Sequence, residues 1–336
     1  MASRSLVVLP DDSAKPILDA IVAASSSIRV KMFVFSDAKL LQALIAARRR
    51  RVRVCVMLNP ARRSGEEENE ETRKALTEAG IDVADSNPDF QLTHEKSMVV
   101  DEKTAFVNSL NWSTKNLTGT RDYAVVTSHK QEVFEIVDCF EADWHRHRFD
   151  AGNEPRLIWC PGGRDRIARF IDGARHTLFL QNERYQDTVI IEHLVRASRR
   201  GVKVHVMTRP PHTLKQEKLV EGVGGLRILD DVGIKIHELK HLKLHAKMFL
   251  ADGVSAIVGS INLAPGSLDD RRELAIEVRD AEVMDRLYDV ARHDWKHSHP
   301  LDLSDEGLLA DLEERAEEAE RLGLVDPDAA GKKSPA

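Results

Sequence analysis

The stretch His94-Glu95-Lys96-Ser97-Met98-Val99-Val100-Asp101 has a second, altered copy in His245-Ala246-Lys247-Met248-Phe249-Leu250-Ala251-Asp252. Both copies fit the pattern HxKxxxxD, and they lie 151 residues apart. Working outward, other residues recur at the same offset: Ser109 with Ser260, Asn111 with Asn262, Arg121-Asp122 with Arg272-Glu273, and Asp143-Trp144 with Asp294-Trp295. The strand-like segment 53–57 recurs as 203–207, at an offset of 150.

A repeat of about 150 residues has the length of a whole domain and is too long for a solenoid unit, so it indicates an internal duplication. The repeated residues include His, Lys and Asn, which core packing gives no reason to repeat. The sequence therefore predicts one polar site that is built from two similar halves.

Composition indicates an ordinary globular protein. The chain has 336 residues, of which 42% are hydrophobic and 31% charged, which suits two domains with a large core. Its apolar runs stop well short of the roughly 20 residues that a membrane span needs, and the apolar stretch near Met1 is too short for a signal peptide. Cys55, Cys139 and Cys160 show no CxxC spacing, which argues against disulfides or a zinc site. We expect a cytoplasmic location, with any attachment to the membrane being peripheral.

The net charge of −6 is unevenly distributed. Residues 301–336 contain 11 acidic and 4 basic residues, so this acidic tail accounts for −7 and the rest of the chain stands at +1. A dedicated binder of duplex DNA usually carries a strong basic excess. The nearly neutral body therefore argues against that class of protein.

Each half of the chain alternates strand-like and helix-like segments. In the first half, residues 28–34 and 52–58 are expected to be strands and residues 38–49 a helix; in the second, 177–181 and 202–208 are expected strands and 188–199 a helix. This alternation predicts an α/β fold of two duplicated α/β/α sandwich lobes, related by a pseudo-twofold axis, with mixed, mostly parallel sheets.

The predicted domains are a first lobe over residues 1–150, a second lobe over 151–300, and an acidic helix with a disordered tail over 301–336. The join between the lobes falls at the Gly/Asn/Pro cluster of residues 150–155. Ser304, followed by two acidic residues, predicts the N-cap of the final helix.

The repeated polar residues predict a pocket for an oxyanion. Side chains two apart in a strand share a face, so His94 and Lys96 point the same way, as do His245 and Lys247. Ser109 with Asn111, and Ser260 with Asn262, share faces in the same manner and would add hydroxyl and amide groups. No carboxylate cluster or short HxH spacing favours Mg²⁺ or Zn²⁺. We therefore expect no metal and no cofactor, and a phosphate diester fits the pocket.

The symmetry of the pocket suggests a mechanism. One histidine can attack phosphorus to form a covalent phosphohistidine, while the other protonates the leaving alcohol and then deprotonates the incoming water or alcohol. Lys96, Lys247, Asn111 and Asn262 would bind the non-bridging oxygens and stabilise the transition state. Asp122 and Glu273, each 28 residues after a motif histidine, are candidates to hold an imidazole in the required tautomer.

The chain carries both HxKxxxxD motifs and both SxN motifs, and on these it resembles the phospholipase D superfamily. The resemblance covers about residues 6–298. The resemblance implies a two-lobed fold with the site between the lobes and metal-free transfer of phosphodiesters. It also implies that His94 is the nucleophile and His245 the general acid and base. The motif aspartates, Asp101 and Asp252, are counted with the catalytic motif, in a supporting role.

The first copy departs from the GSxN pattern of this superfamily. The second copy reads Gly259-Ser260-Ile261-Asn262, but Asn108 occupies the place of the glycine in the first. Asn also tolerates left-handed backbone geometry, so catalysis stays plausible, and only the shape of that side of the pocket is in question. Trp112 next to Asn111 is either a substrate-lining residue or part of the core. The basic run from Arg48 to Arg53 is either a solvated helix end or a phosphate contact.

The expected substrate is a phospholipid, cleaved or transferred as by a phospholipase D or a cardiolipin synthase. The nearly neutral body and the basic segment of Lys240, His241 and Lys243 near the second motif favour a lipid. The alternative is an endonuclease that cleaves nucleic-acid diesters by the same two-motif mechanism, although aromatic residues make up only 5% of the chain. Because one chain carries both half-sites, this pseudo-dimer needs no second copy for catalysis.

Overall fold

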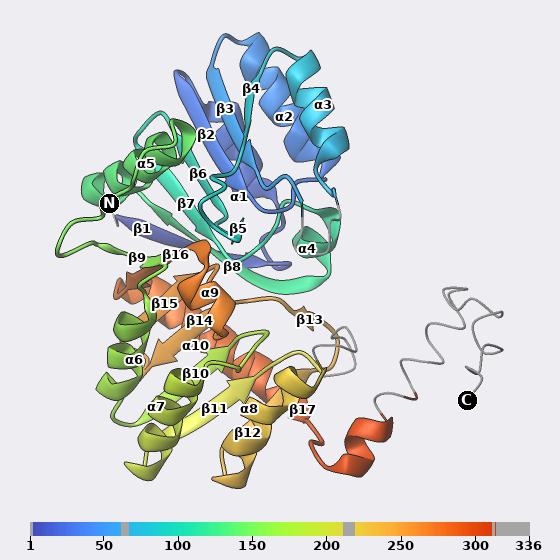
Figure 1. Ribbon diagram of the computed structural model, residues 1–336, viewed down its shortest axis with the longest axis vertical. Helices are drawn as coiled ribbons and strands as arrows, with labels where there is room; N and C mark the ends of the chain where they lie inside the picture. The colour runs from blue at the N-terminus through green and yellow to red at the C-terminus, as the bar shows by residue number, and fades with distance from the viewer. Residues whose placement is uncertain (1–2, 62–66, 211–218, 311–312, 314–336) are drawn as a thin grey trace, which may run out of the picture.

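The computed structural model describes residues 3–61, 67–210, 219–310 and 313, and they form two similar lobes (Figure 1). The first lobe contains β1 (Arg4–Leu9), α1 (Lys15–Ala23), β2 (Ser27–Met32), α2 (Ala38–Arg49), β3 (Arg53–Leu58), α3 (Glu70–Glu78), β4 (Asp82–Asp85), β5 (Leu92–Thr93), β6 (Ser97–Val100), β7 (Thr104–Asn108), α4 (Thr114–Thr118), β8 (Thr120–Thr127) and α5 (Lys130–Trp144).

The second lobe repeats this order with additions at its end. It contains β9 (Leu157–Cys160), α6 (Arg164–Gly173), β10 (Thr177–Gln181), α7 (Thr188–Arg199), β11 (Lys203–Met207), α8 (Leu219–Asp231), β12 (Lys235–Leu239), β13 (Lys243–Leu244), β14 (Met248–Ala251), β15 (Ser255–Gly259), α9 (Pro265–Asp269), β16 (Arg271–Val278), α10 (Ala281–Lys296) and β17 (Ser298–Pro300). The duplicated α/β fold class is thereby confirmed.

The sheets are mixed, but the expectation that they are mostly parallel is wrong. In the first sheet, with order β1-β8-β7-β6-β2-β3-β4, only the β2–β3 and β3–β4 pairs are parallel. The other pairs along this order are antiparallel. The reason is the connection length: only residues 101–103 join β6 to β7, and a parallel crossover needs a dozen residues or more. The second sheet repeats the arrangement, with β10–β11 and β11–β12 parallel and β14, β15 and β16 antiparallel.

The predicted helices 38–49 and 188–199 are present as α2 and α7, and both begin at an aspartate. The Asp37 carboxylate accepts hydrogen bonds from the backbone N–H groups of Lys39 and Leu40, and the Asp187 carboxylate accepts one from Ile190. Such side-chain acceptors satisfy the free donors of a helix start. The matching caps, 150 residues apart, show that the duplication extends to local structure.

Among the described residues, three large hydrophobic cores organise the layers, beside a small cluster of Cys55, Met57 and Phe140. Helices α1, α2 and α3 cover the outer face of the first sheet, and α6, α7 and α8 cover that of the second. The third core lies between the lobes and contains buried residues from both sheets together with α5 and α10. Figure 1 shows α2 and α3 on the opposite side of the first sheet from α5. The two inner sheet faces therefore share one core.

The lobes also exchange short strands. β5 of the first lobe pairs with β16 of the second, and β13 of the second lobe pairs with β8 of the first. Two buried ion pairs reinforce this exchange: Arg121 with Asp294, at 2.9 Å, and Arg272 with Asp143, at 3.1 Å. These four residues are two of the repeated pairs in the sequence, so part of the repeated polar chemistry joins the lobes.

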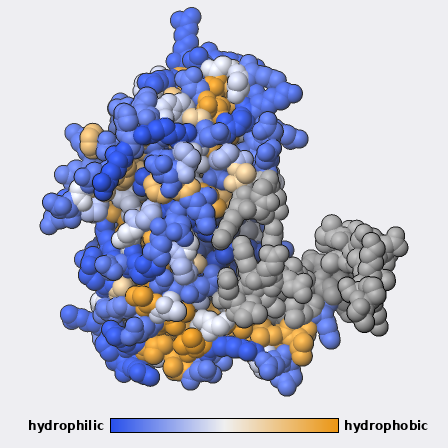
Figure 2. Space-filling model, in the orientation of Figure 1, coloured by the Kyte–Doolittle hydropathy of each residue, from blue (hydrophilic) through white to orange (hydrophobic). Residues whose placement is uncertain are grey.

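The face drawn in Figure 2 is mainly hydrophilic, with larger hydrophobic patches over the second lobe at the bottom of the view. Among the described residues, no helix combines the length and the apolar character required to cross a bilayer. Residues 305–310 are helical, and the Ser304 hydroxyl accepts a hydrogen bond from the Gly307 N–H at 3.0 Å, as an N-cap does. The expected continuation of this helix and the tail lie outside the described residues, apart from residue 313.

Candidate active site at the lobe interface

Both motif histidines directly follow the exchanged strands. His94 comes after β5, and its backbone N–H donates to the Arg272 carbonyl of the second lobe at 2.9 Å. His245 comes after β13, and its N–H donates to the Arg121 carbonyl of the first lobe at 3.2 Å. Each histidine is thus fixed against the opposite lobe. The pairing brings the two repeats to one site.

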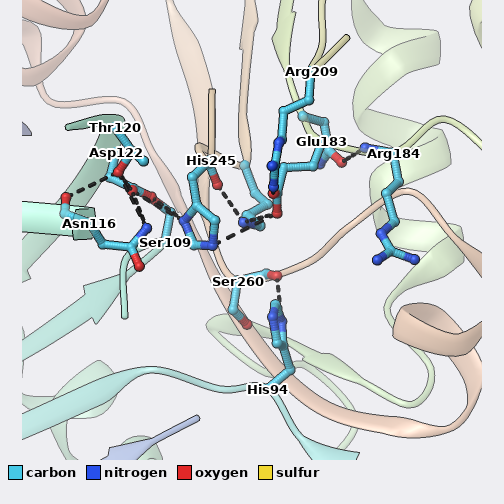
Figure 3. Close-up of polar contacts among 12 residues, drawn as sticks. His94, Ser109, Asn116, Thr120, Asp122, Glu183, Arg184, Arg209, His245 and Ser260 are labelled. Carbon is cyan, nitrogen blue, oxygen red and sulfur yellow. Dashed lines mark hydrogen bonds and ion pairs between the residues drawn. The ribbon is translucent and has the colours of Figure 1, made fainter. Parts of the chain in front are cut away.

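The carboxylates predicted to orient the histidines also act across the interface. His94 Nδ1 lies 2.9 Å from Glu273 Oε2. His245 Nδ1 lies 2.9 Å from Asp122 Oδ1 (Figure 3). A carboxylate can only accept, so each Nδ1 carries a hydrogen, and Nε2 is the nitrogen of each ring that is left to face a ligand. Sequence spacing identified these acids, but not that each serves the histidine of the other lobe.

Further polar groups hold the two carboxylates in place. Asp122 accepts hydrogen bonds from the hydroxyls of Ser109 and Thr120, both at 2.6 Å. Glu273 accepts one from Ser267 Oγ. Because a hydroxyl has one hydrogen to donate, Ser109 is already committed to Asp122. Ser260 Oγ lies 3.2 Å from the Leu274 carbonyl, within its own sheet. The structure thus gives both serines other partners than the expected phosphate.

The motif lysines are buried beside the histidines. Lys96 Nζ donates to the His94 carbonyl at 2.5 Å, and Lys247 Nζ donates to the His245 carbonyl. Asn111 and Asn262 are buried too, and the amide oxygen of each has no hydrogen-bond partner among the described residues. The lysine ammonium groups retain hydrogens to donate to a ligand. The free amide oxygens of the asparagines can only accept, so these residues would meet a phosphate oxygen through their amide NH2 groups.

The motif aspartates lie at the far end of the motif, away from the imidazoles. Asp101 accepts hydrogen bonds from the backbone N–H groups of residues 25–27, at the start of β2. Asp252 does the same for residues 175–177, at the start of β10. Both aspartates have left-handed backbone geometry, with φ of 54°. Their grouping with the catalytic residues is therefore corrected to a structural role in the turn that joins two strands.

Burial and neighbouring charges shift the pKa values of several site residues. Burial, assisted by Lys96 and Lys247, lowers the pKa of His94 well below its ordinary value. Burial also lowers the pKa of Lys96, against the opposing effect of Glu273. Asp122 is buried as well, but His245 and Lys247 outweigh that effect and lower the pKa of its carboxyl group. A neutral His94 is the form that can attack phosphorus.

Sequence reasoning missed two residues that lie at equivalent places in the halves, 150 residues apart. The Phe33 ring packs against the His94 imidazole, with 4.9 Å between the ring centroids, and lies 5.2 Å from Lys96 Nζ. Its counterpart Glu183 accepts a hydrogen bond from Lys247 Nζ at 2.8 Å. The signal was available in the repeat itself, because both residues follow equivalent strands, β2 and β10.

A buried acidic cluster beneath the site is already neutralised. Glu95, Cys139 and Asp143 offer three ligand atoms within 4.8 Å of one another. Lys31 Nζ contacts all three, at 2.9 Å, 3.4 Å and 2.8 Å respectively. The Lys31 ammonium, together with the Arg272 guanidinium that pairs with Asp143, thus balances the two carboxylates.

Two interpretations left open by the sequence are decided by contacts. Trp112 is fully buried and packs edge-on against Phe35, so it belongs to the core. Arg48 donates to the Gly80 carbonyl at 2.7 Å, and Arg50 donates to the carbonyls of residues 21 and 22. These two arginines connect helix ends, which favours the structural reading of the basic run.

Comparisons with known proteins agree with this geometry. A family model described as "Cardiolipin synthase, PLD-like domain" matches residues 17–144 and again 167–295. Cardiolipin synthase B of Shigella flexneri is 25% identical over 324 residues, which cover 81% of this chain and 75% of the relative. Polyphosphate kinase 1 of Chlorobaculum tepidum is 26% identical over 303 residues, covering 83% of this chain but only 42% of the kinase.

Solved structures show the same fold. The phosphatidylserine synthase of Haemophilus influenzae superposes with a TM-score of 0.72 at 10% identity, covering 96% of this chain and 94% of that one. The polyphosphate kinase of Porphyromonas gingivalis gives a TM-score of 0.65 at 18% identity, covering 87% of this chain. This chain spans half the length of that kinase structure, with 50% covered.

Proposed function

Because the chain belongs to the family of cardiolipin synthase, PLD-like domains, matched over both lobes, we propose that it is a metal-independent phosphatidyltransferase or phosphodiesterase that acts on phospholipids through a covalent phosphohistidine. One observation carries the proposal. Two imidazoles, each oriented at Nδ1 by a carboxylate of the opposite lobe, leave Nε2 available beside two buried lysines.

The proposed reaction has two steps with balanced proton transfers. His94 Nε2 attacks phosphorus while the bond to the leaving alcohol breaks, and His245 donates its Nε2 proton to the departing oxygen. Water or a second alcohol then attacks the phosphohistidine, loses its proton to His245 and releases neutral His94. Lys96, Lys247, Asn111 and Asn262 would bind the non-bridging oxygens, where fixed donors stabilise developing charge.

A lipid substrate is favoured by the relatives and by the surface near the site. Cardiolipin synthase B and phosphatidylserine synthase are named for lipid products. Lys240, His241 and Lys243 are exposed just before His245, where they could contact an anionic membrane surface. We infer a cytoplasmic protein that binds the membrane peripherally and works as a single chain. The alternative remains an endonuclease with the same two-step chemistry.

A mixed-substrate assay separates these functions. The purified chain is incubated in parallel with phosphatidylglycerol vesicles, with phosphatidylcholine plus an added alcohol, and with single-stranded DNA. Release of phosphatidic acid or formation of a new phosphatidyl alcohol supports the lipid proposal. Cleavage of DNA alone overturns it in favour of the nuclease.

The same assay is repeated in EDTA, and the activity is expected to survive. The carboxylates at the site, Asp122 and Glu273, are each engaged by an imidazole, and the lysines supply the positive charge. Loss of activity that Mg²⁺ or Zn²⁺ restores would contradict the metal-free mechanism. The variant His94→Ala is the blank for contaminating activity.

A further inference from the structure

The two halves of the site differ at one pair of equivalent positions next to the motif histidines. Phe33 places an aromatic ring beside His94, but Glu183 places a carboxylate beside His245. Glu183 Oε2 lies 3.8 Å from His245 Nε2 and 2.8 Å from Lys247 Nζ. On its other side, Glu183 Oε1 accepts a hydrogen bond from Arg209 at 2.8 Å (Figure 3). The twofold symmetry of the motifs is therefore broken at the reacting nitrogens.

The charges around the two imidazoles consequently differ. His245 has a carboxylate near each ring nitrogen, Asp122 at Nδ1 and Glu183 at Nε2. Among the residues that the structure describes, His94 has a carboxylate at Nδ1 alone, and an aromatic ring packs beside it. An opposite charge within about 4–6 Å favours the charged form of an ionisable group. The two imidazoles thus face different charges: a second carboxylate lies near Nε2 of His245, and an aromatic ring lies beside His94.

We propose that Glu183 is a positioning residue that divides the two histidine roles, holding the proton on His245 Nε2 so that this residue starts the reaction as the acid. The inference rests on the proposed function. In the first step, the proton held near Glu183 passes from His245 to the leaving oxygen as the phosphorus–oxygen bond breaks and the His94–phosphorus bond forms. Glu183 keeps its own charge throughout and forms no bond to the substrate.

The remaining charged neighbours support an ionised Glu183. Its side chain is 12% exposed. Burial opposes its charge, but Lys247, His245 and Arg209 outweigh that effect and hold its pKa well below the ordinary value. The ionisable groups that face His245 come from several elements. Asp122 lies on β8, Glu183 follows β10, and Lys247 belongs to the same motif as His245. Arg209, which follows β11, contacts Glu183, and His94 and Lys96 belong to the other motif.

The leaving group provides the first test. Release of an alkyl alcohol needs an acid, but release of p-nitrophenolate from bis(p-nitrophenyl) phosphate does not. For Glu183→Gln we expect a loss of at least about 10²-fold in kcat/KM with the phospholipid, in the range of general acid catalysis. The single-turnover burst of p-nitrophenolate should stay within about threefold of wild type, since general acid assistance is not required there.

The pH profile provides a second test, because two variants should shift its alkaline limb in opposite directions. The first step requires protonated His245, so the activity falls as the pH rises and that proton is lost. Removing the Glu183 charge makes the proton easier to lose, so Glu183→Gln should move the alkaline limb of kcat/KM to lower pH. In Arg209→Gln, Glu183 loses a neutralising partner, and the alkaline limb should move to higher pH.

Controls separate failure of this inference from failure of the proposed function. Glu192→Gln removes an exposed ion pair on α7 and should behave as wild type in both assays. Equal losses on the two substrates, or an unmoved alkaline limb, would overturn the role of Glu183 while the wild type remains active. A wild type inactive on both substrates would instead overturn the proposed function. If Glu183→Gln does not give a wild-type thermal transition, the shift in Arg209→Gln decides.

Discussion

The imidazole of His245 meets its carboxylate, Asp122, 123 residues away in the chain, and His94 meets Glu273 at a separation of 179. At the residue scale, the candidate chemistry thus depends on contacts that neither lobe can make alone. The carboxylates fix the tautomers, and Phe33 and Glu183 make the two halves unequal. An equal pair of histidines would have no reason to divide the roles of nucleophile and acid.

The roles of the two histidines can be tested by trapping the phosphoenzyme. With bis(p-nitrophenyl) phosphate, His245→Ala should accumulate an acid-labile, base-stable phosphohistidine, because the first step needs no acid and the second lacks its base. His94→Ala should form none, which mass spectrometry of the peptide that contains residue 94 would check. Trapping in His94→Ala but not in His245→Ala would reverse the assignment.

At the scale of the element, the strands β7 and β15 end in different residues at the first position of the GSxN pattern, Asn108 and Gly259. A side chain on Gly259 would place its Cβ 2.2 Å from the Leu274 carbonyl oxygen and 2.4 Å from Ala275 Cα. The first lobe tolerates Asn108 at the equivalent position, but both polar atoms of its buried amide lack a partner among the described residues. The departure from the GSxN pattern is therefore accommodated by local strand packing.

This difference predicts opposite responses to alanine. Gly259→Ala should lower the free energy of unfolding by about 1–3 kcal/mol, the usual cost of overpacking a core. Asn108→Ala should be neutral or stabilising, because it removes a buried polar group that has no hydrogen bond. Urea unfolding of the two variants beside the wild type checks both. A destabilised Asn108→Ala with an unaffected Gly259→Ala would show that the packing explanation is wrong.

At the scale of the whole molecule, the lobes are joined by their shared core, the exchanged strands and the two buried ion pairs. Arg121 donates two hydrogen bonds to Asp294, at 2.9 and 3.0 Å. Arg272 makes the equivalent contacts with Asp143, both at 3.1 Å. The arginines directly precede the carboxylates that orient the histidines. The lobe interface and the geometry of the site are consequently coupled.

The coupling predicts that loss of one interface charge affects the whole molecule. Asp294→Asn should reduce the free energy of unfolding by about 3–5 kcal/mol, because Arg121 remains buried with a weakened partner set. Thermal and urea unfolding measure the effect. Glu192→Gln, an exposed pair, should change the stability by no more than about 1 kcal/mol. A similarly small effect for Asp294→Asn would contradict the proposed importance of the interface pair.

The sequence by itself determined the duplication and the α/β class and predicted the candidate site residues, because a repeat at fixed offset is visible without coordinates. It could not assign Asp122 to His245 or Glu273 to His94, since those contacts depend on how strands cross between lobes. It also grouped Asp101 with the catalytic motif in a supporting role, and Ser109 with the phosphate ligands, because a motif lists residues without their directions.

Only the tertiary structure decided which repeated residues serve the interface and where the symmetry breaks. Arg121 and Asp294 recur with their counterparts as strictly as the histidines do, yet they join the lobes. Glu183 does not recur at all, yet it lies beside both Lys247 and His245. Repetition records common ancestry of the halves, but the electrostatics of a buried site depend on distances between groups that are remote in the chain.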